Sequence, residues 1–116
     1  MKKVNTINFK KTLSKFSTGI TVVCVKNNNS IYGKTVNSFN SLSLNPPMVL
    51  FSLGNYSSSI KQFSKTNFLS INILSSKQKK LSDNFASTRP KLENIKFIEG
   101  KYKTAIIPNC IANLEC

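Results

Sequence analysis

The chain has 116 residues, of which 17 are Lys or Arg and four are Asp or Glu, so its formal net charge is +13. This length suits one domain with a modest core, and we expect residues 1–116 to form a single domain. Histidine is absent, which excludes a histidine general base, a histidine metal ligand and a histidine-based catalytic triad within this chain.

The positive charge favours anionic partners such as nucleotides, nucleic acid or acidic lipids. The lysines are scattered, however, and asparagine often accompanies them. Because Lys and Asn both have AT-rich codons, an AT-rich genome explains the same bias.

The cysteines Cys24, Cys110 and Cys116 do not have the spacing of metal ligands. No apolar signal core follows the first three residues, and no apolar run is long enough to cross a bilayer. An odd number of cysteines in such a chain favours a reducing cytoplasm.

The first predicted element is a short helix over residues 8–17, followed by Gly19, a residue typical of helix ends. Apolar side chains recur on one face of this helix at Phe9, Leu13 and Phe16. Residues 20–26 are rich in β-branched side chains and apolar on both faces, which predicts a buried central strand. Residues 27–30 predict a hairpin turn, and a return strand begins at Ile31.

The stretch 32–59 alternates small polar residues with apolar ones, turns at Asn45-Pro46-Pro47 and ends in a serine cluster. Alternate side chains of a strand share one face. With a kink near Ser38, one face carries Thr35, Asn37, Ser41 and Ser43, and the other carries Val36, Leu42 and Leu44. Short neutral donors suit a flat heterocycle rich in acceptors, whereas a polar edge strand in any β-protein is the alternative.

Residues 48–53 predict a buried strand, and Ser57 or Ser58 caps a short helix that runs to about Lys65. A helix start with free amides and serine hydroxyls suits a phosphate. Plain N-capping is the alternative explanation of the same serines.

Residues 68–74 predict a strand, and Ser75 or Ser76 begins a helix that extends through Phe85. Arg89, the only arginine, follows this helix, and its forked guanidinium suits a phosphate unless it is simply solvated. A short strand at 95–98 and an alternating strand at 111–116 complete the chain. Short strands with helices between them predict a mainly β fold, a barrel decorated by helices.

The order of these motifs resembles the flavin reductase-like family, the small NAD(P)H:flavin oxidoreductases that supply reduced flavin to two-component monooxygenases. The resemblance rests on residues 16–23, 33–39, 41–47, 68–74, 84–86 and 111–116, which read FSTGITVV, GKTVNSF, SLSLNPP, FLSINIL, NFA and IANLEC. It implies an FMN-binding split β-barrel, usually a homodimer. Family members continue beyond the equivalent of Cys116, so we expect this chain to lack the family's last strands.

The resemblance also implies a flavin site without a catalytic side chain or a metal, in which hydride passes from NAD(P)H to FMN or FAD. The residues along the ring and ribityl chain are Thr35, Val36, Asn37 and Ser38, with Ser41, Leu42 and Ser43 close by. The residues along the flavin edge are Ser52, Leu53 and Gly54, and those near the phosphate are Ser58 and Ser59. Phe85 and Arg89 come from a loop that closes over the cofactor.

Two other functions remain open. A flavin-binding protein without turnover is one, because the Gly-Asp-His segment associated with the nicotinamide side is absent. A basic nucleic-acid-binding module is the other, supported by charge alone. The phenylalanines argue against a nucleic-acid-binding module, because they fit core positions better than base-stacking ones. They are Phe9, Phe16, Phe39, Phe63, Phe68 and Phe85.

Overall fold

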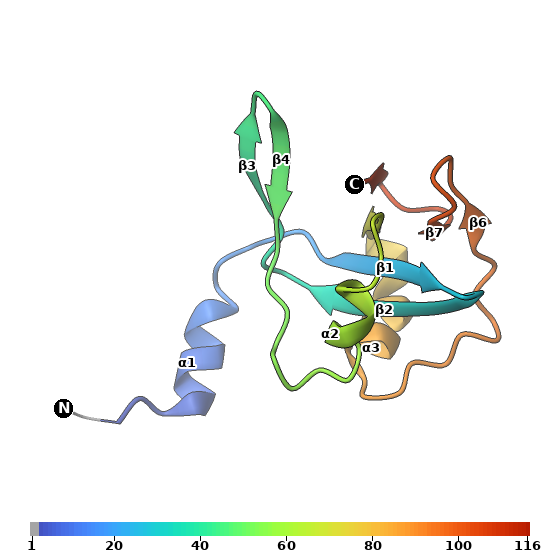
Figure 1. Cartoon of the computed structure of the whole chain (residues 1–116). Helices are drawn as coiled ribbons and strands as arrows, with labels where there is room; N and C mark the ends of the chain where they lie inside the picture. Colours follow the sequence, from blue (N-terminus) through green and yellow to red (C-terminus); the bar gives the residue numbers. More distant parts are fainter. Residues whose placement is uncertain (1–2) are drawn as a thin grey trace.

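The computed structural model describes residues 3–116 and centres on a four-stranded antiparallel sheet (Figure 1). The strand order is β2-β1-β5-β8, formed by β1 (Thr21–Asn27), β2 (Ser30–Val36), β5 (Ser70–Ile73) and β8 (Ala112–Glu115). Two separate hairpins pair β3 (Asn40–Leu44) with β4 (Pro47–Leu50) and β6 (Ile98–Glu99) with β7 (Ala105–Ile106). The helices are α1 (Thr6–Leu13), α2 (Ile60–Phe63), the 3-10 turn η1 (Ser76–Gln78) and α3 (Lys79–Ala86).

The predicted central strand is confirmed. Strand β1 pairs with β2 on one side and β5 on the other, and its first five residues are buried. Its alternating side chains serve two cores, since Val22 and Cys24 pack with Phe85 of α3, whereas Val23 packs with Ile71. The hairpin turn is confirmed as well, because Asn28 and Asn29 take φ values of 47° and 66°, which asparagine tolerates better than most residues.

Helix α3 covers one face of the sheet and α2 lies over the other (Figure 1). The predicted helix start at Ser75 is confirmed, because Ser75 and Gln78 form a reciprocal capping box. Phe85 is fully buried at the end of α3, where its ring leaves no room for a side chain at Gly33. Phe85 therefore belongs to α3 and not to the expected loop, and its place at the cofactor stays a prediction.

A buried asparagine joins the sheet to the segment that follows β7. The side chain of Asn72 donates to the Val22 carbonyl at 3.0 Å and accepts from the Ile107 amide at 2.9 Å. It also accepts from Asn113 of β8 at 2.8 Å. Because every polar atom of this amide has a partner, its burial is compatible with a stable core.

Helix α1 and the β3–β4 hairpin project from the body of the molecule (Figure 1). Asn5 caps α1 by accepting from the Ile7 and Asn8 amides, so the helix begins earlier than predicted. Phe9 and Leu13 of the predicted apolar face lie on α1 and are 52% and 55% exposed, whereas the helix ends before Phe16, which is 78% exposed. The assignment of Phe9 and Phe16 to the core is wrong, because helical periodicity identifies an apolar face but not its partner.

Two further core assignments need correction. The strand expected at 48–53 is only β4, and Met48 and Leu50 remain 44% and 40% exposed. Phe68 is 45% exposed and stacks on Tyr102 with the ring centroids 4.9 Å apart. Phe39 and Phe63, in contrast, pack against the Val23 core as predicted. Among residues 3–116, no helix combines the length and apolar character needed to cross a bilayer.

Candidate functional site

The candidate site begins on β2, which is an edge strand of the central sheet. The side chain of Val36 is buried with Val23 and Ile71. Val36 therefore contributes to the core beneath β2 and does not present its side chain to a ligand. Thr35 points to the other face, where its hydroxyl donates to the Ser82 carbonyl of α3 at 2.6 Å. Thr35 therefore fastens α3 to the edge strand, and this internal bond occupies its hydroxyl proton.

The strand breaks after Val36, as the predicted kink near Ser38 requires. Asn37 is exposed in this break. The Ser52 amide donates to Ser38 Oγ at 2.8 Å, so the two predicted site residues contact each other. This contact ties the start of the β3–β4 hairpin to its end and fixes where the hairpin leaves the body.

The hairpin carries three further predicted residues. A bulge between Ser41 and Ser43 interrupts the pairing of β3 with β4. Leu42 lies at this bulge with 58% of its side chain exposed. Bulges re-aim side chains and are frequent beside functional sites, and here the bulge breaks the alternation that the sequence pattern assumed.

The serine cluster lies between Gly54 and α2. The Ser57 amide donates to the Gly54 carbonyl at 3.0 Å, which closes the turn that follows Leu53. Ser59 is the N-cap residue of α2, but no side-chain hydrogen bond caps the helix. Helix α2 thus starts later than predicted, and the hydroxyls of Ser58 and Ser59 are not used as caps.

Ser57 has the one buried side-chain polar atom without a hydrogen-bond partner among residues 3–116. The sequence predictions included its two neighbours but treated Ser57 only as a cap. An unpaired buried hydroxyl has an energetic cost and calls for a partner. No sequence signal could distinguish Ser57 from Ser58, because the distinction depends on burial.

Arg89 is exposed in the segment that follows α3. Two contacts hold this segment against the body. The side chain of Asn84 accepts from the Lys91 amide at 2.9 Å and donates to the Lys91 carbonyl at 2.7 Å. Lys34 Nζ of β2 donates to the Ser87 carbonyl at 3.2 Å. Asn84 and Lys34 therefore hold the chain on either side of Arg89, and sequence reasoning assigned neither of them this role.

The free thiols do not supply a reactive nucleophile. Burial, with a smaller contribution from nearby Cys110, raises the pKa of the Cys24 thiol to about 12. Burial also raises the pKa values of Cys110 and Cys116. Raised pKa values favour the thiol over the thiolate, which is the nucleophilic form of cysteine.

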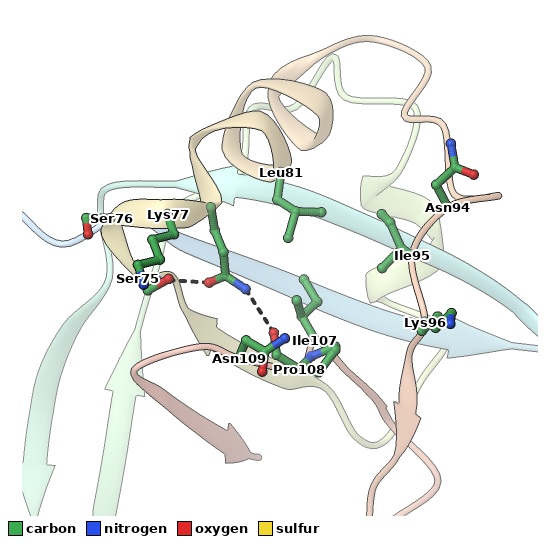
Figure 2. A pocket seen from close by; sticks show the side chains of 11 residues that line it. Ser75, Ser76, Lys77, Leu81, Asn94, Ile95, Lys96, Ile107, Pro108 and Asn109 are labelled. Carbon is green, nitrogen blue, oxygen red and sulfur yellow. Dashed lines mark hydrogen bonds between the residues drawn. The ribbon is translucent and has the colours of Figure 1, made fainter.

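Among the predicted residues, Ser38 and Ser52 are joined directly by a hydrogen bond, and the others contact residues outside the predicted set or solvent. A cavity of about 920 Å³ lies elsewhere, between η1 and the segments around Ile95 and Pro108, and none of the predicted residues lines it (Figure 2). The exposed polar side chains of the predicted set are those of Asn37, Ser41, Ser52, Ser58 and Arg89.

Comparison with known proteins decides the family. The model of the flavin reductase like domain matches residues 13–116, nearly the whole chain. The chain belongs to the flavin reductase-like family. The resemblance inferred from the motifs is thus confirmed.

Among relatives of this flavin reductase-like chain, an FMN reductase (NADH), SmoA of Agrobacterium fabrum, is 35% identical over 97% of this chain and 64% of its own length. The reductase subunit HsaB of a flavin-dependent monooxygenase from Mycobacterium tuberculosis is 33% identical, over 93% of this chain and 58% of its own length. The chain thus spans roughly three fifths of the length of these relatives.

Solved flavin reductases share the fold of this chain. The flavin reductase PheA2 in its native state superposes with a TM-score of 0.86 at 34% identity, covering 97% of this chain and 73% of PheA2. The NADH:FAD oxidoreductase SgcE6 of Streptomyces globisporus, in complex with NAD and FAD fragments, gives a TM-score of 0.88 at 26% identity, covering 100% of this chain and 73% of its own. The predicted mainly β split-barrel fold with short helices is confirmed.

Proposed function

We propose that this chain is an NAD(P)H-dependent flavin reductase that transfers a hydride from NAD(P)H to FMN, with FAD as the alternative flavin. The observation that carries the proposal is the family match over residues 13–116. Relatives named as NADH-dependent reductases of flavin, FMN or FAD support the same activity. We further propose that residues 1–116 act as one domain.

The donor groups of the chain fit a flavin nucleotide. The unpaired, buried hydroxyl of Ser57 lies beside Ser58 and Ser59, where a phosphate oxygen would satisfy it. Exposed Asn37 and Ser41 supply neutral donors for a heterocycle with acceptor atoms. The surplus of 13 positive charges favours both the flavin phosphate and the nicotinamide nucleotide.

The bound flavin would supply the hydride acceptor, so the protein needs neither a nucleophile nor an acid–base pair. The residues of the protein bind the flavin and orient it. We assign Asn37, Ser41 and Ser43 to hydrogen bonds with the ring and ribityl chain, with Leu42 and Leu53 as apolar contacts. Ser58, Ser59 and Arg89 hold the phosphate. The backbone along the flavin edge is shaped by Ser38, Ser52 and Gly54. The strand and helix behind the site are held in place by Thr35, Val36 and Phe85.

We propose a homodimer, and a monooxygenase component as the consumer of reduced flavin. Relatives named as reductase components of monooxygenases support the second partner. The exposed apolar side chains of α1 and of the β3–β4 hairpin support the homodimer, because a second copy of the chain could cover them. Three free cysteines agree with a reducing cytoplasm as the location.

Two successive measurements test the proposed function. Titration of the protein with FMN is expected to quench flavin fluorescence to saturation. Addition of NADH is then expected to give steady NADH oxidation with free FMN as acceptor. Saturable FMN binding without NADH oxidation would instead favour a flavin-binding protein without turnover. Failure to bind FMN or FAD would contradict both, and a salt-sensitive shift of DNA would then favour the nucleic-acid module.

A further inference from the structure

The cavity of about 920 Å³ has no part in the proposed reductase site, since none of the residues assigned to the flavin lines it. Three segments form it, namely η1 with the start of α3, the loop around Ile95 and the segment that follows β7 (Figure 2). Its volume lies in the range typical of small-molecule sites, which is roughly 300–1,000 Å³.

The floor of the cavity is aliphatic. Leu81, Ile95 and Ile107 line it from three separate segments, and all three belong to the core that contains Phe85. Ile107 is fully buried and the other two are half-buried, so core packing holds the floor in place. An apolar ligand group could cover this surface and remove it from water.

One side chain fastens the wall of the cavity. Gln78 accepts from the Ser75 amide at 2.9 Å and donates to the Pro108 carbonyl at 2.8 Å (Figure 2). The first bond closes the turn before α3, and the second ties that turn to the segment after β7. The cavity is therefore largely preformed, as small-molecule sites usually are.

The charges on the rim have one sign. Lys77 and Lys96 line the cavity from different segments, and no Asp or Glu lines it. The ion pairs found among residues 3–116 are Lys26 with Glu99 and Lys79 with Asp83, so neither rim lysine is neutralised by a carboxylate there. Two uncompensated ammonium groups beside an aliphatic floor attract an anion that also has an apolar part.

We propose that this cavity binds a small carboxylate with an apolar body of about the size of one aromatic ring. Lys77 and Lys96 lie at opposite ends of the cavity (Figure 2), so the carboxylate lies at the rim in the positive field of both, and the apolar body covers Leu81, Ile95 and Ile107. A neutral ligand leaves the two ammonium groups without a counter-charge. An inorganic anion leaves the aliphatic floor in contact with water.

The test uses 4-fluorobenzoate as the probe and fluorine NMR to follow its binding to the full chain, without flavin or nicotinamide nucleotide. Saturable binding is expected, with 4-fluorobenzamide, a neutral molecule of similar shape, binding about fivefold more weakly. Lys77→Gln and Lys96→Gln are each expected to weaken 4-fluorobenzoate about threefold to fivefold. Lys80→Gln removes the same charge from an exposed position outside the cavity and is the matched control.

Amide shifts in a nitrogen–proton NMR spectrum locate the bound probe, and they are expected at Lys77, Ile95, Lys96 and Asn109. Equal binding of the amide, an equal loss in Lys80→Gln, or shifts centred on the serine cluster would overturn the proposal. So would absence of saturation at concentrations on the order of ten millimolar. Because no flavin is present, such a failure leaves the proposed reductase activity untouched.

Discussion

At the scale of single residues, the contact between Gly33 and Phe85 decides how closely α3 approaches the sheet. A Cβ atom built at Gly33 would lie 2.6 Å from the Phe85 ring, which is closer than real Cβ contacts allow. Gly33→Ala is therefore expected to lower the free energy of unfolding by about 1–3 kcal/mol, through overpacking of a filled core. Urea unfolding measures this loss.

Gly19→Ala is the matched control, because nothing lies within 4 Å of a Cβ built at Gly19. We expect it to leave the free energy of unfolding unchanged or slightly higher, since alanine restricts the unfolded chain more than glycine does. Equal losses in the two variants would contradict the assigned role of Gly33.

Arg89 carries the residue-scale prediction for the flavin. Of FMN and riboflavin, only FMN has a phosphate, so Arg89→Ala is expected to weaken FMN binding about tenfold and to change riboflavin affinity little. Fluorescence titration with both ligands measures the two affinities. Lys61→Ala, which also removes one exposed positive charge, controls for the general field of the protein. A similar loss for FMN and riboflavin would refute the phosphate role of Arg89.

At the scale of elements, a carboxylate of β8 organises the turn that precedes β7. Glu115 accepts from the Lys101 amide at 3.0 Å, from the Tyr102 amide at 3.1 Å and from the Thr104 hydroxyl. A side chain at Gly100 would collide with this carboxylate. The turn is therefore built around a single ionised group.

The Thr104 hydroxyl, followed by the amides of Tyr102 and Lys101, holds the pKa of Glu115 below its ordinary value of 4.5. A depressed folded-state pKa contributes stability above the unfolded-state pKa, and that contribution is lost as pH falls through the folded-state pKa. We therefore compare how the urea midpoint changes as the pH is lowered from about 4.5. The midpoint of the native chain is expected to decrease more steeply than that of Glu115→Gln. Parallel curves for the two proteins would show that Glu115 does not contribute to acid sensitivity.

Elements of this fold differ in how well the sequence predicts them. Strand β1, its hairpin turn and the capped start of η1 follow from local patterns, namely β-branched residues, consecutive asparagines and a serine three residues before a glutamine. Helix α1 and strand β4 were predicted as apolar elements, but their burial was not predictable, because it depends on what packs against them.

The candidate site shows the same division. Alternation in β2 placed Thr35 and Val36 on opposite faces, and the structure bears this out. The sequence did not reveal that Asn84 and Lys34 position the arginine segment, because both contacts join residues far apart or in different elements. Nor did it reveal the buried hydroxyl of Ser57, since three consecutive serines are equivalent until the fold buries one of them.

At the scale of the whole molecule, the shape is extended for a chain of this length. The radius of gyration is 15.0 Å, whereas about 13 Å is expected for a compact domain of this size. The excess corresponds to α1 and the β3–β4 hairpin, which extend from the body (Figure 1). Exposed apolar side chains lie on both projections, among them Leu44 of β3 at 89% and Phe16, in the turn that follows α1, at 78%. Monomeric proteins rarely leave such surfaces in water.

A second copy of the chain is the partner that we propose for these surfaces, and substitution of their apolar side chains tests it. Light scattering after size-exclusion chromatography is expected to give a dimer for the native chain. Phe16→Ser combined with Leu44→Ser is expected to raise the dimer dissociation constant at least tenfold, because a few side chains buried in an interface carry most of its binding energy. Circular dichroism should remain unchanged, since neither side chain contributes to the buried cores of the sheet. Tyr56→Ser, at an exposed tyrosine outside both projections, is the control. A native chain that is monomeric at micromolar concentration, or a dimer that survives the double substitution, would contradict a dimer interface at these surfaces.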